Sequence, residues 1–462
     1  MSSRRFASLG TAIVLLSTKA YPQAVPREGM TLPEAIALAS TSFGEARASR
    51  SELSASTESL NLAKRSYLPE ANLYFQWNRA SRNNTFGLVF PSAGLPGISG
   101  PALEDETSQG TFGSVAALLV RWEAFDFGAR SAAVDEAAAL KRRAEAGLRA
   151  TEIEVSLGAA DTFLGLVAAE SAVEAAAAAV ARMEIFASAV SARVENELRP
   201  GADLSLARAE LARTKSELVR TEGIREQTRV SLAEWLGRTG ERVDVNGSRL
   251  LESTPPAEVP PPQEVQNPLA EVGRAERDAA QARREIARRS FHPRIDLLAS
   301  FYGRGTGALL DGSFEGGSAG LWPERTNWAL GLALRFPLLD FLARQETNVA
   351  EYREEAANAR WEKTLERVEA DLERARIHLD AARRIVENTP AELEAARALQ
   401  VQARGRYDAG LAEVLEVAEA ERTLRRAETE DVLARLDVWR ARFEVAAAEG
   451  DLAPVISELE DR

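Results

Sequence analysis

The chain carries the same short motifs twice, in the same order. Ser66–Leu73 (SYLPEANL) is similar to Ser290–Leu297 (SFHPRIDL), and Phe125–Arg130 (FDFGAR) is similar to Leu339–Arg344 (LDFLAR). One short match arises easily by chance, but two matches in one order indicate an internal duplication, and a repeat dominates the choice of fold. We therefore expect two copies of one structural unit within the chain.

A proline-rich segment separates the two copies. Pro255, Pro256 and Pro260–Pro262 fall within residues 255–266, which we interpret as a stiff, extended linker. The chain then divides into a first repeat at 25–254, a second repeat at 267–450 and a C-terminal tail at 451–462.

The first 24 residues have the features of a secretory signal peptide. Arg4 and Arg5 form a basic start and Phe6–Leu16 is largely apolar, a segment too short to span a bilayer. No later stretch of about 18 apolar residues predicts a membrane-spanning helix. The exported chain is thus expected to be periplasmic, secreted or an outer-membrane β-barrel protein.

Each repeat contains two segments in which large apolar residues alternate with small or polar ones. In the clearest, Trp328–Phe336, the residues Trp, Leu, Leu, Leu and Phe alternate with Ala, Gly, Ala and Arg. Such a period of two predicts strands of about ten residues, a length that suits transmembrane β-strands. A half-buried soluble sheet shows the same alternation. The expected strands lie at about 71–79, 112–124, 294–303 and 327–337.

Helices are expected on both sides of each strand pair. A capping box, Thr31-x-x-Glu34, starts a first helix that runs to about Ser66, and the second repeat also begins with a helix. Apolar residues in the long helices recur with a period of seven, which favours coiled-coil packing. The long helices are expected at 131–198 and 344–408, and the shorter return helices at 203–236 and 414–449.

Several residues are expected to form the junctions between these elements. Pro69 and Pro293 stop the helices that precede the strands, and Asp126 and Asp340 are expected to be N-caps of the long helices. Pro390 should disturb the second long helix, with residues 389–392 (TPAE) forming a new helix N-terminus.

Four strands are too few to close a barrel, and an open sheet leaves unpaired edges that lipid does not tolerate. Three protomers would supply 3 × 4 = 12 strands, an even number in the range of known barrels. The sequence therefore predicts an α+β membrane protein. In it, four strands per protomer are pooled into a trimeric 12-stranded transmembrane β-barrel, continued by a long helical coiled-coil periplasmic tunnel.

Composition removes most enzymatic and nucleic-acid functions. The chain has 57 Lys and Arg against 70 Asp and Glu, a net charge of −13, and no basic tail, so a nucleic-acid partner is not expected. It has no Cys, and His292 and His378 are its two histidines. We find no catalytic motif, and we expect no cofactor, no metal site and no enzyme activity.

These motifs together resemble the TolC-type outer membrane efflux protein family, the outer membrane factors, over nearly the whole mature chain. The resemblance is carried by Tyr67-x-Pro69 and Phe291-x-Pro293 before the strands, and by Asp126-x-Gly128-x-Arg130 and Asp340-x-x-x-Arg344 after them. The second half has Leu342 where the family often has Gly.

The resemblance implies a function and a set of partners. It implies an outer-membrane channel of a tripartite efflux or type I secretion system, a passive homotrimeric exit duct for small molecules or polypeptides. A periplasmic adaptor (membrane fusion) protein would open it at its periplasmic tip. An inner-membrane pump of the resistance-nodulation-division, ABC or major facilitator type would power transport, and outer-membrane lipid would surround the barrel.

The resemblance also implies roles for particular residues at the helix turns. Glu416 and Glu419, one helical step apart, would ring the pore gate with six carboxylates in a trimer, although a solvated acidic helix face has the same pattern. Asp203 and Tyr407 would form a hydrogen-bonded tip lock, and Ala412 occupies the place of the family's second, arginine lock. The adaptor-contacting tip would comprise Pro200, Gly201, Gly410 and Leu411.

Two alternatives remain beside the channel. A periplasmic or surface coiled-coil scaffold without transport, whose strands form a soluble cap, explains the same helices and strands. An enzyme comes a distant third because no catalytic constellation is present in the sequence. A channel would fractionate with outer membranes and conduct ions, whereas a scaffold would be extracted by salt.

Overall fold

The computed structural model describes residues 29–81, 110–252, 255, 259, 267–307, 309, 315–337 and 341–461. The expected signal peptide, Asp340 and most of the proline-rich linker lie outside these residues. The first repeat contains α1 (Leu32–Ser42), α2 (Gly44–Arg65), β1 (Glu70–Ser81), β2 (Gly110–Phe125), α3 (Ala129–Glu195), α4 (Gly201–Trp235) and α5 (Ser248–Glu252). The second contains α6 (Pro268–Arg289), β3 (Arg294–Thr306), β4 (Arg325–Arg335), α7 (Phe341–Val386), α8 (Thr389–Asp408) and α9 (Val414–Glu449), and α10 (Ala453–Asp461) follows.

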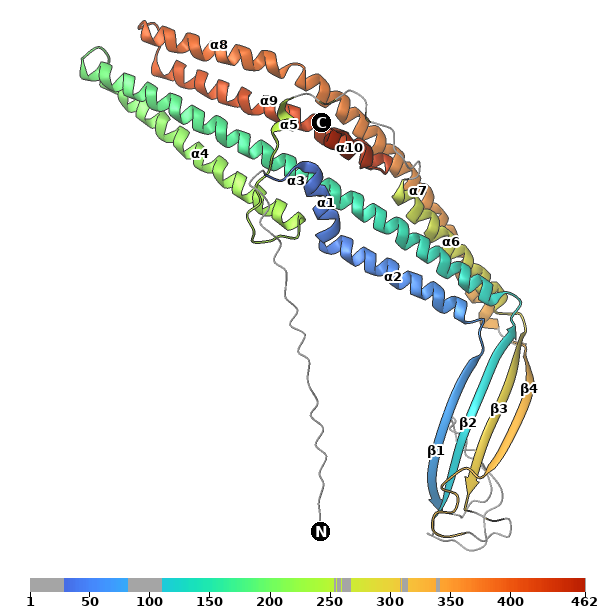
Figure 1. The fold of residues 1–462 in the computed structure, drawn as a ribbon. Coiled ribbons are helices and arrows are strands. Elements are labelled where there is room, and N and C mark those ends of the chain that lie inside the picture. Colours follow the sequence, from blue (N-terminus) through green and yellow to red (C-terminus); the bar gives the residue numbers. More distant parts are fainter. Residues whose placement is uncertain are drawn as a thin grey trace, which may run out of the picture.

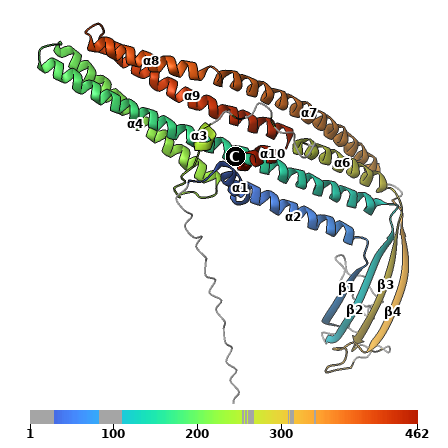
Figure 2. The ribbon, with the colours of Figure 1, turned by 45° about the horizontal axis from the view of Figure 1, so that its top comes forward.

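The protein is an elongated helical body with a small sheet at one end (Figure 1). The turns between α3 and α4 and between α8 and α9 lie at the opposite end, and the view in Figure 2 shows the same arrangement. The mostly helical chain with one four-stranded sheet confirms the α+β class. The four strands fall on the four segments that show alternation, and α9 has the expected bounds.

The sheet is an antiparallel meander in the order β1-β2-β3-β4, so β1 and β4 are its edge strands. Leu73 lies opposite Leu118, and Leu118 lies opposite Phe301, so these large side chains share one face. A bulge at Glu123 and Phe125 interrupts the β2–β3 register just before the chain enters α3. The sheet therefore has an apolar and a polar face, and its end joins the helices directly.

The core of the helical body lies in its middle, where both repeats meet. Phe163 of α3, Leu232 of α4 and Trp439 and Phe443 of α9 are almost fully buried in one cluster. Arg442, also fully buried, forms an ion pair with Glu458 of α10, which satisfies a charge that would otherwise be costly to bury. This cluster joins the two repeats into one body.

One helix passes a test of length and composition for a membrane span. An 18-residue window of α3 is long and apolar enough to cross a membrane by length and composition. Of that window, 44% is buried inside the structure, and α3 packs against α4, α6, α2 and α9. The apolar composition of α3 is explained by its central position in the helical body.

The helix expected from Thr31 to about Ser66 is broken into α1 and α2. Glu34 accepts a hydrogen bond from the Thr31 N–H at 2.9 Å, as the capping box predicts. Phe43, however, adopts an extended conformation, and its ring stacks on Trp235 with centroids 4.8 Å apart. A contact with a residue far along the chain thus interrupts a locally continuous helical pattern.

The second long helix is interrupted near Pro390. α7 ends at Val386 and α8 begins at Thr389, with Pro390 at its second position and Asn388 as the N-cap residue in place of Thr389. The Thr389 hydroxyl donates instead to Asp431 of α9 at 2.8 Å. A tertiary contact has replaced the local cap.

Candidate functional site

One face of the sheet exposes a continuous set of large apolar side chains. Their exposure is high: Leu330 is 76% exposed and Trp328 is 73% exposed. Exposed apolar surface of this extent is unstable in water and indicates contact with lipid or another protein. This apolar face comprises Leu73, Phe75, Trp77, Leu118, Trp122, Leu297, Phe301, Trp328, Leu330, Leu332 and Leu334.

The opposite face of the same strands carries mostly polar, charged and small residues, with a few aliphatic ones among them. Asp296 of β3 is buried on this face between two guanidinium groups, Arg335 at 2.8 Å and Arg121 at 3.2 Å. Sequence reasoning missed this cluster, because the three residues come from three different strands. The polar face comprises Glu70, Asn72, Tyr74, Gln76, Val115, Ala117, Leu119, Arg121, Glu123, Arg294, Asp296, Leu298, Ser300, Tyr302, Arg304, Arg325, Asn327, Ala329, Gly331, Ala333 and Arg335.

Asp126 was expected to be the N-cap residue of α3, but it lies two residues before the N-cap position. The N-cap position belongs to Gly128, because Phe127 (φ 53°) and Gly128 (φ 90°) turn the chain in the left-handed region. This turn brings the Asp126 carboxylate back to accept from the N–H groups of Gly128 at 3.1 Å and Arg130 at 2.6 Å. Burial raises the Asp126 pKa, but these hydrogen bonds and the Arg130 guanidinium together outweigh burial, so the pKa is lowered.

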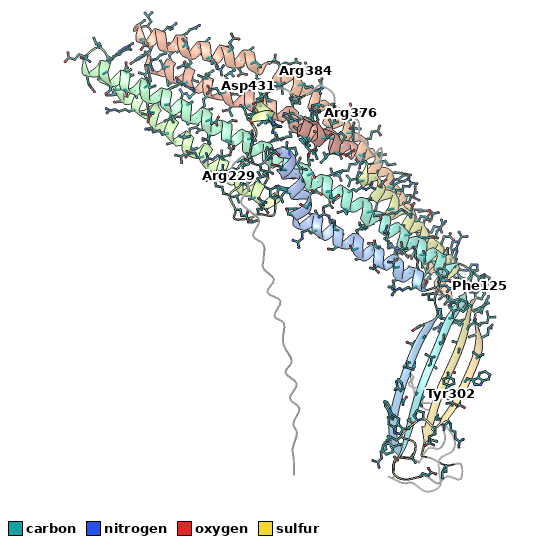
Figure 3. The ribbon with its side chains drawn as sticks, in the orientation of Figure 1. Phe125, Arg229, Tyr302, Arg376, Arg384 and Asp431 are labelled. Carbon is teal, nitrogen blue, oxygen red and sulfur yellow. The ribbon has the colours of Figure 1, made fainter. Side chains whose placement is uncertain are left out.

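The helix-to-strand junctions surround Asp126. The Arg130 side chain contacts Asp126 at 3.0 Å and lies over the Tyr67 ring, 4.8 Å from its centroid. Pro69 directly precedes β1, and Pro293 directly precedes β3. Phe125, labelled in Figure 3, ends β2 at this junction.

In the second repeat, Arg344 lines an open cleft of about 510 Å³ together with His292 and Arg288.

The two helical turns at the far end of the body are joined around Tyr407. Its side chain is fully buried, packs edge-to-face on Phe186 and lies beneath the guanidinium groups of Arg193 and Arg199 at 5.3 and 4.8 Å. Arg193 also forms an ion pair with Asp408 at 2.8 Å. Two arginines of the first repeat therefore hold the turn of the second.

Arg193 and Arg199 were missed from the sequence. The local signal was their position on either side of the expected helix end, within seven residues of Pro200. Arg199 of the first repeat donates to the carbonyl oxygens of Tyr407 and Ala412, each at 3.3 Å, so an arginine contacts the backbone at the position where the resemblance places the second lock.

The expected Asp203–Tyr407 hydrogen bond is not formed within this chain. The Tyr407 hydroxyl and Asp203 Oδ2 are both buried, and neither has a hydrogen-bond partner among the described residues. Arg199 approaches Asp203 at 3.9 Å and lies against the Tyr407 ring, so the two side chains meet the same guanidinium. Burial and the nearby Asp203 charge raise the Tyr407 pKa.

Glu416 and Glu419 each have an arginine partner. Glu416 pairs with Arg406 of α8 at 3.1 Å, and Glu419 pairs with Arg422 one turn further along α9 at 2.6 Å. Both carboxylate side chains remain substantially exposed. Their charge is therefore partly compensated within the chain, which weakens the negative field expected from a bare acidic ring.

The turns themselves expose small and apolar residues. Leu198 is 73% exposed and Leu411 is 72% exposed. Pro200 is the N-cap residue and Gly201 the first residue of α4, while Gly410 has φ 78°, a conformation that favours glycine. Both leucines lie beside the residues that the resemblance assigns to the adaptor-contacting tip.

Comparisons with known proteins agree with this geometry. A family model described as outer membrane efflux protein matches residues 44–238 and 264–451. A comparison with curated protein sequences gives no match. The solved structures show the same fold at low sequence identity. The outer membrane protein VceC from Vibrio cholerae is 20% identical, with a TM-score of 0.72 over 91% of this chain and 96% of that chain.

Two further structures are similar. The CmeC outer membrane channel of Campylobacter jejuni is 16% identical, with a TM-score of 0.72 over 93% of this chain and 89% of that chain. The open MtrE outer membrane channel of Neisseria gonorrhoeae is 17% identical, with a TM-score of 0.68 over 91% and 89%.

The family match, together with the shared fold, identifies the chain as an outer membrane channel protein. The chain belongs to the outer membrane efflux protein family. It is an efflux channel component located in the outer membrane with a periplasmic helical extension. Channels of this family are trimers that work with periplasmic adaptors and inner-membrane pumps, and the family is one of transport proteins, not of enzymes.

Proposed function

We propose that three copies of this chain pool their sheets into a 12-stranded transmembrane barrel, continued by a hollow helical tunnel that acts as a passive exit duct. The observation that carries this proposal is a four-stranded sheet with one exposed apolar face and two edge strands, β1 and β4. Lipid offers no hydrogen-bond partners to a sheet edge, so each edge needs a strand from another copy.

Cysteine cross-linking tests the pooled sheet, because the natural chain has no Cys. Asn72→Cys on β1, combined in turn with cysteines at 327, 329, 331 and 333 on β4, should give disulfide-linked trimers in outer membranes. As a matched control, Leu119→Cys with Ser300→Cys, which lie directly opposite each other on β2 and β3, should cross-link within one chain. Monomers that salt releases from the membrane would favour the scaffold instead.

The exposed turns are the proposed docking site for a periplasmic adaptor, at Pro200, Gly201, Gly410 and Leu411. Leu411→Asp should abolish capture of the adaptor, because a charge replaces an exposed apolar contact. Val401→Asp is the matched control, since Val401 on α8 is 67% exposed but lies away from the turn. Equal capture by both variants would exclude the turns as the docking site.

The adaptor would connect the duct to an inner-membrane pump of the resistance-nodulation-division, ABC or major facilitator type. The cargo would then be small molecules, or polypeptides if the pump belongs to a type I secretion system. Co-purification of the full-length channel with its adaptor and pump, followed by measurement of export from cells that lack the channel, tests this assignment.

Glu416 and Glu419 are proposed to line the gate, which the adaptor would open. Asp203 and Tyr407 would take part in a tip lock through their shared contact with Arg199, and Arg193–Asp408 would tie the two turns together. Arg193→Gln should raise the open probability of single channels in planar bilayers. Arg220→Gln on α4 is its control, because Arg220 is exposed. Equal open probabilities of the two variants would show that Arg193 does not hold the channel closed.

A further inference from the structure

Two arginines lie directly opposite each other at the end of the sheet that is far from the helices. Arg304 of β3 pairs in register with Arg325, the first residue of β4. Arg304 lies ten residues beyond the start of β3, about 33 Å along an extended strand. Tyr302, labelled in Figure 3, and its partner Asn327 are the next pair on the same polar face.

This pair is unfavourable for the sheet itself. Like charges directly opposite each other on neighbouring strands destabilise the pairing. Within the part of the chain that the structure describes, neither side chain forms an ion pair, and the β2 neighbour of Arg304 is the uncharged Val115. Glu324, next to Arg325, contacts Arg304 through backbone atoms, its N–H donating to the Arg304 carbonyl at 3.0 Å.

The other end of the polar face is electrically balanced. There, Asp296 accepts both Arg121 and Arg335, and Glu123 lies 3.9 Å from Arg294. Together with Glu70, which is paired in register with Arg121, three carboxylates face three guanidinium groups. The excess positive charge of the described polar face is therefore confined to Arg304 and Arg325.

We propose that Arg304 and Arg325 form an anion-selective ring at the outer end of the channel. This inference rests on the proposed trimeric barrel with its polar face inward, in which three copies bring six guanidinium groups around the lumen. Guanidinium groups bind carboxylate and phosphate oxygens in bidentate fashion, so the ring favours small solutes with such groups. It acts at the exit, separately from the carboxylates of the helical turns.

Planar-bilayer recordings of the full-length protein under a potassium chloride gradient test the ring. We expect the wild type to favour chloride over potassium in reversal potential at about 0.1 M salt, and the Arg304→Gln/Arg325→Gln variant to lose at least about threefold in that permeability ratio. Pyrophosphate added on the side of the strand loops should block the wild type and not this variant. Arg304→Lys/Arg325→Lys should keep the chloride preference and lose most of the block.

The matched control is Arg79→Gln, since Arg79 lies near the same end of the sheet but on the apolar face, over the Phe112 ring. It should leave both the reversal potential and the block unchanged. If the wild type and the double variant conduct with equal selectivity and equal block, the arginine ring is refuted, whereas the proposed trimeric duct is retained. If correctly assembled wild-type trimers conduct no ions, the proposed duct fails and the ring fails with it.

Discussion

Thr389 of α8 donates a hydrogen bond from its Oγ1 to Oδ1 of Asp431 on α9 at 2.8 Å, and both side chains are buried. Arg435 contacts the other carboxylate oxygen at 3.0 Å and also donates to the Leu251 carbonyl at 3.2 Å. Asp431 is labelled in Figure 3 close to the interruption between α7 and α8. This hydrogen bond therefore connects the first residue of α8, next to Pro390, to α9.

Thr389→Val should lower the free energy of unfolding by about 1–3 kcal/mol, because it removes a hydrogen bond from a buried carboxylate while nearly conserving volume. Denaturant titration followed by circular dichroism measures the change. Thr364→Val on α7 is the control: that hydroxyl is exposed, donates only within its own helix, and its loss should have little effect. Equal effects of the two substitutions would show that the Asp431 contact does not stabilise the fold.

Tyr407→Phe should leave stability unchanged or raise it by about 1 kcal/mol, since the Tyr407 hydroxyl is buried without a hydrogen-bond partner among the described residues. Tyr407→Ala should lower stability by about 3–5 kcal/mol, because it empties the space against Phe186. Thermal unfolding of both variants provides the measurement. A clear loss of stability in Tyr407→Phe would instead indicate that the Tyr407 hydroxyl does form the hydrogen bond to Asp203 that the family resemblance implies.

His378 of α7 lies between two carboxylates of α9, Glu444 at 2.7 Å and Asp437 at 3.3 Å, while Arg440 also contacts Asp437. The hydrogen bond to Glu444 is the main cause that raises the His378 pKa, against the opposing effect of burial. The stabilising contribution is therefore complete below the ordinary histidine pKa and is lost as pH rises through the raised value.

His378→Gln should accordingly destabilise the protein more at about pH 5.5 than at about pH 8.5, because only the protonated ring is attracted to both carboxylates. Melting temperatures of the wild type and the variant at the two pH values measure the difference. A gap between the two proteins that stays constant with pH would contradict the assignment.

Leu330→Arg should hinder insertion into the outer membrane, because Leu330 is at the centre of β4 on the apolar face. Arginine at the bilayer midplane costs about 2–4 kcal/mol. The neighbouring Ala329→Arg lies on the polar face and should insert normally. The yield of membrane-embedded protein after urea washing compares them, and equal yields would mean that the apolar face does not contact lipid.

The sequence predicted the elements that depend on local patterns. Strict alternation such as that from Trp328 to Phe336 marks a strand whatever surrounds it, and Pro390 interrupts a helix because its ring cannot fit a continuous one. The fold class and the family followed from those patterns and their duplication.

Features that depend on distant partners were not predictable in this way. The break at Phe43 exists because Trp235 offers a stacking surface, and Tyr407 meets Arg199 instead of hydrogen-bonding to Asp203 because two helical turns converge there. Asp296 gave no local signal, since its arginine partners lie on two other strands.

The edge positions of β1 and β4 also determine whether mutations in the chain are dominant or recessive. In the proposed trimeric ring, β1 of each copy would pair with β4 of the next, so one faulty edge would leave the whole ring open. In a cell that makes both normal and mutant subunits, most normal subunits would assemble with at least one mutant subunit into rings that cannot close. Edge-strand mutations should therefore behave as dominant, whereas mutations that unfold the helical core before assembly should behave as recessive.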